Sequence, residues 1–196
     1  MTRRLSTEQR QRQIAEAALG LISRGGVGSF TTSAIAEEVG LAEGTIFRHF
    51  SNKQEIALAA ISLLEERLEE SFPDEDLPPL ERLGLFMRHR LELVIAHRGV
   101  FRAFFSDQLG MAAGPEGVAR MERIKNKSLQ FLRQCLSEAR AEGELGSTLA
   151  PEFLLRIIQG TVQAFLFGTP TPTSEGEEPP EIARKTWSSL FDLIRK

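Results

Sequence analysis

The sequence predicts an all-α fold of about nine helices, and three observations lead to this class. Apolar residues recur at helical spacing along almost the whole chain of 196 residues. No segment shows the strict alternation of a half-buried strand. Glycine and proline fall mainly between the periodic segments, where they end one helix or open the next. The chain is long enough for one large domain or for two small domains that share a core.

The first 50 residues predict three helices with short breaks between them. The first helix runs from about Thr7 to Arg24 and carries an apolar stripe, and a glycine-rich break follows it. Thr31 or Thr32 can cap a short second helix, and Gly40 ends it. A third short helix covers about 43–50, so three helices follow one another closely at this end of the chain.

The remaining residues predict six further helices. Ser51 is placed to cap a long helix that extends to about Leu68, and Glu55 is placed to complete the cap. The Pro- and Asp-rich segment 73–79 predicts a loop, and the Pro/Thr/Glu-rich segment 169–180 predicts a mobile one. The other expected helices cover 80–97, 100–111, 115–142, 151–167 and 181–196.

Composition excludes several classes of protein. With 24 basic and 27 acidic residues, the formal charge of −3 argues against a general nucleic-acid coat protein. The longest apolar stretches fall far short of the roughly 20 residues that a membrane span needs. The start Met-Thr-Arg-Arg lacks the apolar core of a secretion signal. One cysteine, Cys135, excludes an internal disulfide and suits a reducing compartment, so we expect a cytoplasmic protein.

The charge is unevenly distributed along the chain. Residues 1–55 hold seven basic and six acidic residues, and the rest holds 17 basic and 21 acidic residues. Four of the seven basic residues, Arg3, Arg4, Arg10 and Arg12, lie within the first twelve positions. A small basic arm on an acidic body is thus expected, and it suits a protein that touches nucleic acid at one end only.

The second and third helices have the proportions of a helix-turn-helix. They are separated only by Gly40-Leu41-Ala42, and the second helix of such a motif enters the major groove of DNA. The inward positions of the two helices form a small core of Ile35, Ala36, Val39, Ile46 and Phe50. A helix of two turns cannot also bury Thr45, Phe47, Arg48 and His49, so some of these face outward and are candidates for contacting DNA. Hydroxyls and free N–H groups at the start of the second helix suit phosphate.

The sequence from Phe30 reads Phe-Thr-Thr-Ser-Ala-Ile-Ala-Glu-Glu-Val-Gly-Leu-Ala-Glu-Gly-Thr-Ile-Phe-Arg-His-Phe-Ser-Asn-Lys-Gln-Glu-Ile. It closely resembles the DNA-binding signature of the TetR family of bacterial transcriptional regulators, over about the first 60 residues. The resemblance implies a helix-turn-helix DNA-binding domain over 1–50 and a larger helical ligand-binding and dimerisation domain over 51–196.

The resemblance also implies which residues contact DNA. Those expected at the phosphate backbone are Thr31, Thr32, Thr45, Phe47, His49 and Lys53. Those expected near base edges are Ser33, Gly44 and Arg48. Arg48 is the strongest candidate for reading a base, because its guanidinium can pair with guanine O6 and N7 for roughly 1–3 kcal/mol of discrimination.

Two positions depart from the family's pattern. Phe47 stands where the family usually has tyrosine, whose hydroxyl meets a phosphate, and Ala42 stands where a capping Ser or Thr is common. The missing cap costs roughly 0.5–2 kcal/mol of helix stabilisation. Glu43 also brings a negative charge next to the DNA. We therefore expect weaker operator binding per half-site than in typical relatives.

The later helices carry many aromatic rings, and the resemblance implies that they enclose a small-molecule pocket. Polar residues at apolar-face positions can orient a ligand there, although they can equally be surface residues. The predicted ligand-binding residues are Phe86, Arg90, Phe101, Phe105, Gln108, Phe131, Gln159 and Phe165. A mainly apolar or aromatic effector is expected, and Arg90 leaves an acidic one open.

A stripe of small residues, Gly160, Ala164 and Gly168, occurs at i, i+4 and i+8 of the penultimate helix. With the last helix, including Trp187 and Phe191, it resembles the family's four-helix dimer interface. The alternative is that these residues pack in the chain's own core.

The residues predict no enzyme, no metal site and no cofactor. The only histidines are His49, His89 and His97, and no His-Glu-x-x-His, Cys-x-x-Cys or Gly-x-Ser-x-Gly motif is present. The expected function is a homodimeric regulator, most readily a repressor, that binds a palindromic DNA operator and is released by a small effector. The alternative is an effector-independent DNA-binding or protein-interaction factor on the same fold.

Overall fold

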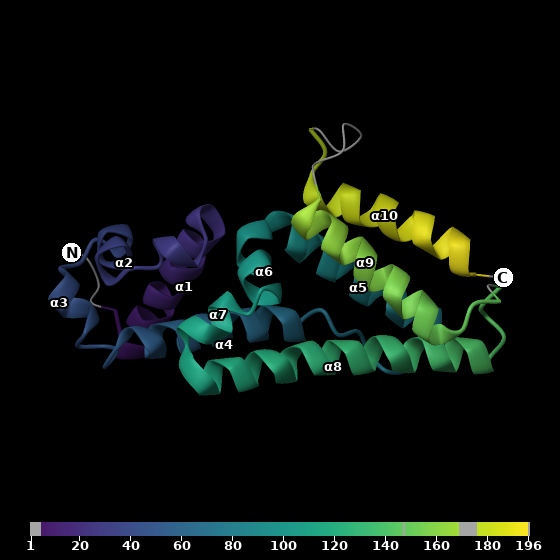
Figure 1. Ribbon diagram of the computed structural model, residues 1–196, viewed down its shortest axis with the longest axis horizontal. Helices are drawn as coiled ribbons and strands as arrows, with labels where there is room; N and C mark the ends of the chain where they lie inside the picture. Colours follow the sequence, from purple (N-terminus) through teal and green to yellow (C-terminus); the bar gives the residue numbers. More distant parts are fainter. Residues whose placement is uncertain (1–4, 147, 169–175, 196) are drawn as a thin grey trace. The chain divides into compact units, whose positions relative to one another are not determined.

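The computed structural model describes residues 5–146, 148–168 and 176–195, and within these ranges it is all α-helical with no β-strand, as predicted (Figure 1). The predicted basic residues Arg3 and Arg4 and most of the predicted loop 169–180 lie outside the described residues. The elements are α1 (Thr7–Gly25), η1 (Val27–Ser29), α2 (Thr32–Val39), α3 (Glu43–Ile46), α4 (Lys53–Glu69), α5 (Pro79–Ala96), α6 (Arg98–Phe105), α7 (Gln108–Ala112), α8 (Gly114–Ala141), α9 (Pro151–Phe167) and α10 (Pro179–Ile194). None of these helices is long and apolar enough to cross a membrane.

The chain forms two compact units, and its backbone passes between them within α4, near the start of α6 and within α8. The first unit comprises residues 1–67 and 99–124, and the second comprises residues 68–98 and 125–196. The predicted boundary at residue 50 separates a DNA-binding domain from a ligand-binding and dimerisation domain. That assignment of roles stays a prediction.

In the first unit, α1 is held at its start by a capping box. The Ser6 hydroxyl accepts a hydrogen bond from the Gln9 backbone N–H, and the Gln9 side chain accepts one from Ser6. The buried face of α1 includes Ile14, Ala18 and Ile22, which are fully buried. α1 packs against α2, and α2 packs against α3, so the three N-terminal helices share this core.

Two of the expected helices differ from the structure. The single helix expected at 100–111 is two helices, α6 and α7, because Asp107 adopts a left-handed backbone with φ 61° that a continuous helix does not accommodate. The third helix is α-helical only over Glu43–Ile46 and continues as turns, with Arg48 and His49 bonded to carbonyls three residues back.

The cap of α4 is Asn52 rather than Ser51. The Asn52 side chain accepts a hydrogen bond from the Glu55 N–H at 3.0 Å, and the Glu55 carboxylate accepts one from the Ser51 N–H at 2.8 Å. Asparagine caps a helix as well as serine does, and α4 begins one residue later than expected.

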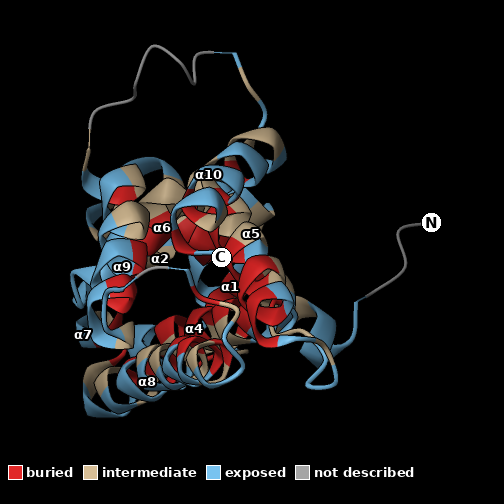
Figure 2. Cartoon of the chain, turned by 90° about the vertical axis from the view of Figure 1, so that its right-hand side faces the viewer, coloured by how far each residue is buried: buried red, intermediate tan, exposed pale blue. Residues whose placement is uncertain are grey.

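In the second unit, α5 packs against α10 and α9, together with the C-terminal half of α8. Buried residues gather on the facing sides of these helices in Figure 2. Trp187 lies in this core, directly against Gly84 of α5. The buried Arg82 forms an ion pair with Glu138, which ties α5 to α8.

Candidate functional site

The helix-turn-helix is built around a left-handed turn at Gly40. Gly40 has φ 68° and ψ 38°, and the Leu41 N–H donates to the Ala36 carbonyl at 2.8 Å. Ile35 of α2 and Ile46 of α3 are fully buried, so the two helices are fixed against each other by apolar contact. The predicted core is observed, with Val39 only partly buried.

The start of α2 presents hydroxyl groups to solvent. Thr31 is the cap, and its hydroxyl accepts a hydrogen bond from the Ala34 N–H at 3.2 Å. The hydroxyl oxygens of Thr31 and Ser33 lie 3.3 Å apart, and both residues are exposed. Exposed N–H groups at the start of an eight-residue helix, with hydroxyls beside them, form an arrangement that suits a phosphate.

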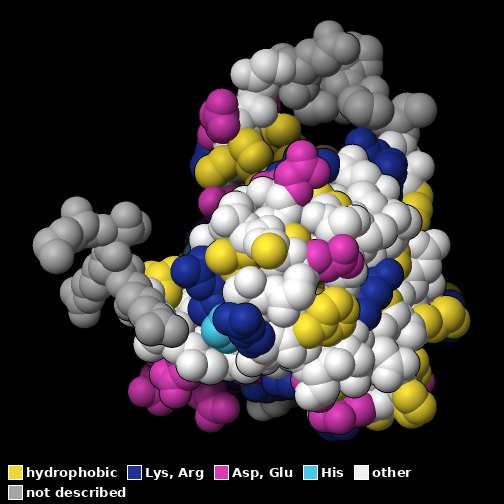
Figure 3. All heavy atoms as spheres, turned by 90° about the vertical axis from the view of Figure 1, so that its left-hand side faces the viewer, with side chains coloured by type: hydrophobic (Ala, Val, Ile, Leu, Met, Phe, Trp, Pro, Cys, Tyr) yellow, Lys and Arg dark blue, Asp and Glu magenta, His cyan; other side chains and the backbone are white. Residues whose placement is uncertain are grey.

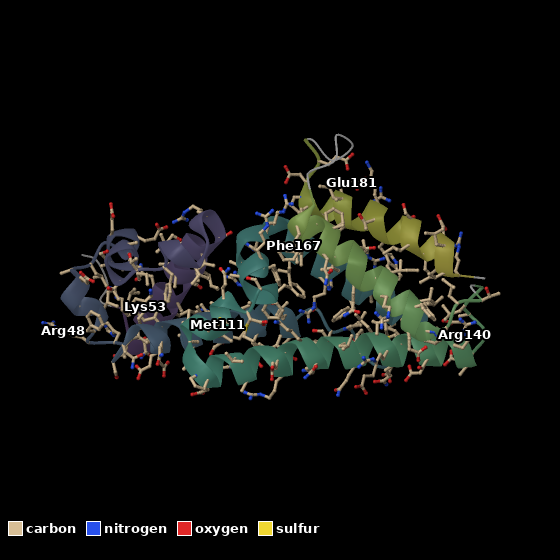
Figure 4. The ribbon with its side chains drawn as sticks, in the orientation of Figure 1. Arg48, Lys53, Met111, Arg140, Phe167 and Glu181 are labelled. Atoms are coloured by element: carbon tan, nitrogen blue, oxygen red, sulfur yellow. The ribbon has the colours of Figure 1, made fainter. Side chains whose placement is uncertain are left out.

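α3 and the turn after it carry the largest exposed side chains of the motif. Phe47 is 48% exposed, so its ring is available for contact with a partner. Arg48 is exposed and projects outward from this end of the unit (Figure 4). Gly44 is exposed with no atom near the position of a Cβ, so the backbone here is open to close approach.

Thr45 and His49 lie nearer to the core of the motif. Both residues are partly buried. The His49 carbonyl accepts a hydrogen bond from the Gln11 side chain of α1 at 2.9 Å. This bond attaches the turn after α3 to the first helix, so Gln11 positions the candidate DNA-binding residues. No motif in the sequence marks Gln11 for such a role.

Lys53 is the first residue of α4, and so lies at the start of the fourth helix as predicted. Its ammonium lies 4.7 Å from the centre of the buried Phe30 ring, a cation–π contact that holds the charge beside the start of α2. The residue itself is exposed. Lys53 therefore presents a positive charge and an α-helix N-terminus at one place.

Some acidic residues of this unit are neutralised by arginines of the same unit. Glu38 pairs with Arg24 at 2.7 Å, and Glu66 pairs with Arg12 at 2.8 Å. By contrast, neither Arg48 nor Lys53 forms an ion pair with any residue that the structure describes. Basic side chains and a histidine lie close together on the face drawn in Figure 3. The surface thus offers free positive charge to an anionic partner.

A second feature lies in the other unit, around Arg90. Arg90 is 9% exposed, and its guanidinium lies 4.7 Å from the Phe86 ring centre and 5.3 Å from that of Phe72. It donates to the Leu68 carbonyl at 3.1 Å and to the Ser128 hydroxyl at 3.2 Å, while its Nε has no partner. Burial lowers the pKa of Arg90 to about 10.

Three phenylalanine rings surround this arginine. Phe72, Phe86 and Phe131 form a triangle with centroid distances of 5.2, 5.3 and 4.8 Å. The structure thus brings together the predicted residues Phe86, Arg90 and Phe131. Phe72 was missed because it lies between the expected end of the helix at about Leu68 and the predicted loop 73–79, where no apolar period indicates burial.

The other predicted ligand residues lie elsewhere. Phe165 packs against the core of the second unit, and Gln159 is exposed on α9. In the first unit, Phe101 is buried, while Phe105 and Gln108 are exposed. Their predicted roles are untested. Among the described residues, no group of three His, Cys, Asp or Glu side chains could hold a metal ion.

α9 exposes an apolar face on the second unit. Phe153 is 60% exposed, Phe167 is 57% exposed, and Ile157 lies exposed between them. The predicted Gly160 and Ala164 are exposed in the same stripe, and Gly168 ends it partly buried. The other predicted dimer residues lie closer to the chain's own core: Trp187 is buried and Phe191 is partly buried beside it, with ring centroids 5.9 Å apart.

Comparison with known proteins agrees with this geometry. The family model for bacterial regulatory proteins of the tetR family matches residues 14–60, the segment that contains the helix-turn-helix. The HTH-type transcriptional regulator SrpR of Pseudomonas putida is 25% identical to this chain over an alignment of 196 residues. The alignment covers 96% of this chain and 87% of SrpR.

Two solved structures share the fold over nearly the whole chain. The ketosteroid transcriptional regulator KstR2 of Mycobacterium tuberculosis has a TM-score of 0.77 at 18% identity, covering 95% of each chain. AibR, solved with isovaleryl coenzyme A and operator DNA, has a TM-score of 0.72 at 24% identity, covering 93% of this chain and 98% of its own. The likeness therefore includes the helices of the second unit as well as the helix-turn-helix.

Proposed function

Because this chain belongs to the TetR family of bacterial transcriptional regulators and is not an enzyme, we propose that it is a homodimeric repressor whose operator binding is relieved by a small effector. The operator is a palindrome, and each subunit binds one half-site. The effector combines an apolar part with an anionic group and binds in the second unit. The protein acts in the cytoplasm, where the DNA is.

The observation that carries DNA binding is the exposed surface of α2, α3 and the start of α4. It gathers the exposed Arg48 and Lys53, which form no ion pair with any described residue, beside the exposed capping hydroxyl of Thr31. Phosphate contacts orient the motif, and side chains of α3 reach base edges. Since one such motif makes few contacts, high affinity requires two of them on a symmetric site.

The exposed face of α9 supports the dimer. Phe153, Ile157 and Phe167 would lie in water in a monomer, and burying them against a second copy recovers the free energy of apolar burial. Gly160 and Ala164 leave room in the middle of this face for a second helix to approach closely. An isologous contact of this kind closes as a two-fold dimer.

Arg90 supports the anionic part of the effector. A buried arginine without an ion pair among the described residues is costly, and a carboxylate or phosphate at its free Nε would repay that cost. Phe72, Phe86 and Phe131 supply an apolar surface beside it. The ligand of AibR, isovaleryl coenzyme A, likewise combines an acyl group with phosphates.

α4 provides a route between the two sites. It begins at Lys53, and the carbonyl of Leu68 in its last turn accepts the hydrogen bond from Arg90. An anion that draws Arg90 away from Leu68 changes the contacts that hold this end of α4. The effector then favours a state in which the two DNA-binding surfaces no longer match the operator spacing, so effector and DNA oppose each other through linkage.

The test is selection of bound DNA from a random duplex pool, followed by challenge of the complex. We expect a palindrome to be selected. Branched and straight-chain acyl-coenzyme A thioesters and free fatty acids are the probes, and uncharged methyl esters of the same chains are the controls. Release by the anions and not by the esters supports the proposal. If no probe releases the DNA, the alternative of an effector-independent factor is favoured.

Variants of one helix separate effector binding from folding. Arg90→Met should abolish release while leaving operator binding intact, and Arg88→Met on the same helix should leave both unchanged. If Arg90→Met responds normally to the anionic probes, the arginine does not bind the effector.

The dimer is tested by filling the small-residue stripe. Gly160 is exposed and has no atom within 4 Å of a Cβ position, so we expect Gly160→Leu to leave the fold of the single chain intact. We expect this variant to sediment as a monomer and to lose cooperative operator binding. Ala119→Leu, an exposed position on α8, is the matched control. A dimer that persists in Gly160→Leu would refute this interface.

A further inference from the structure

Glu43 is an acidic residue on the surface that is expected to face DNA. It is the first residue of α3, it is exposed, and Gly44 beside it is open to close approach. Phosphates repel a carboxylate, so an acid at this place weakens DNA binding unless it is paired with a hydrogen-bond donor of the DNA. The position therefore requires a physical explanation.

The structure shows what holds this carboxylate. The Thr32 hydroxyl of α2 donates a hydrogen bond to Glu43 Oε1 across the turn of the motif. Because Thr32 begins α2, which is fixed in the core by the buried Ile35 and Ala36, the bond restricts the rotamers of Glu43. Thr32, predicted at the phosphate backbone, thus uses its hydroxyl hydrogen inside the protein.

Glu43 has no cationic partner among the described residues, as is also true of Glu8 and Glu37, but it alone of these three is held by a hydrogen bond from a side chain. Glu38 is neutralised by Arg24, and Glu66 is neutralised by Arg12, whereas no described residue forms an ion pair with Glu43. Its Oε2 accepts no hydrogen bond from the described part of the chain. The side chain therefore keeps its charge and one free acceptor atom, held in place by the other oxygen.

We propose that Glu43 reads a cytosine in each half-site, with its free oxygen accepting a hydrogen bond from the cytosine N4 amino group while Thr32 positions the carboxylate. This inference rests on the proposed operator binding. In the major groove, a carboxylate pairs with the amino group of cytosine, and the acceptors N7 and O6 of guanine repel it. Glu43 thus complements Arg48, which suits guanine.

The test compares base preferences of variants on the operator selected by the wild-type chain. At one position per half-site, the wild type should prefer cytosine over the other bases by about 5- to 150-fold. Glu43→Gln should reduce that preference to about twofold or less, because an amide can both donate and accept. Preferences at the other positions should not change. Glu122→Gln, which removes one exposed charge from α8 of the same unit, should behave as the wild type.

Thr32→Val tests the positioning role. It keeps the branched shape and removes the hydroxyl, so the cytosine preference should fall to an intermediate value at the same base only. The double variant Thr32→Val with Glu43→Gln should show the same cytosine preference as Glu43→Gln alone, because Thr32 acts through Glu43. Circular dichroism melting checks that both variants fold.

The outcomes separate this inference from the proposed function. If Glu43→Gln tightens binding to all sequences equally and keeps the cytosine preference, then Glu43 only repels phosphate and the inference is wrong. If the wild type instead prefers adenine at a position and Glu43→Gln loses that preference, the assignment to cytosine is wrong. If the wild type selects no sequence at all, operator binding itself fails.

Discussion

Gly84 lies inside α5 with the indole of Trp187 packed directly on it. A Cβ at this position would lie 2.7 Å from Nε1, 3.0 Å from Cε2 and 3.2 Å from Cζ2 of Trp187. Carbon atoms in contact are ordinarily about 3.5–4.0 Å apart, so the ring must retreat by roughly 1 Å. Trp187 is only 5% exposed, and the core around it leaves little room for that shift.

Gly84→Ala therefore brings two opposing effects. Overpacking a core costs about 1–3 kcal/mol, and replacing glycine inside a helix returns about 0.5–1 kcal/mol. We expect a net loss of about 1 kcal/mol in the free energy of unfolding. Gly20→Ala in α1 is the control, because its only near neighbour is the mobile end of Arg24 at 3.3 Å. That variant should be more stable than the wild type by about 0.5–1 kcal/mol.

Trp187 also provides the assay. It is the only tryptophan, and the chain has no tyrosine, so intrinsic fluorescence reports the contact between α5 and α10. Unfolding in guanidinium, monitored by fluorescence and by circular dichroism, gives the free energies of unfolding of the two variants. Gly84→Ala should also shift the emission maximum of the native state. The difference between the variants measures the overpacking cost. If Gly84→Ala is stabilised as much as Gly20→Ala, the close packing of Trp187 on α5 is refuted.

Three further predictions concern single side chains. Phe47→Tyr should strengthen operator binding by about 2- to 10-fold per subunit, measured by titration at fixed salt, because its hydroxyl can meet a phosphate. The exposed Phe105→Tyr is the control, and unchanged or weaker binding of Phe47→Tyr would contradict the prediction. Arg90→Met should keep or raise the free energy of unfolding by up to about 2 kcal/mol in denaturant titrations at pH 7, since burying the charge costs about 3 kcal/mol. A decrease of more than about 2 kcal/mol in the free energy of unfolding would contradict this prediction and show that Arg90 stabilises the fold. Burial raises the pKa of Cys135 to about 11, so the folded chain keeps this proton to higher pH than the unfolded chain. Stability should fall between about pH 9 and pH 11, and this part of the loss should be absent in Cys135→Ala.

Local signals in the sequence predicted the helix-turn-helix almost completely. The predicted cap was Thr31 or Thr32, and Thr31 is observed; Gly40 ends the helix as predicted, because such signals depend only on the local backbone and near neighbours. The break at Asp107 was missed, since aspartate adopts a left-handed conformation only where the surrounding structure requires it. The cap at Asn52 was missed because Ser51 and Asn52 are both good capping residues.

The sequence by itself determined the helical class and the position of the motif, because these follow from the period of the apolar residues; it left open which of the side chains from Thr45 to His49 face outward. Only the tertiary structure decided which distant groups meet. The bond from Thr32 to Glu43, the attachment of Gln11 to His49 and the rings around Arg90 join residues from different helices. A helical period fixes the face on which a residue lies, but not the neighbour that covers that face. For that reason, the partner of a charged or aromatic side chain had to come from the fold.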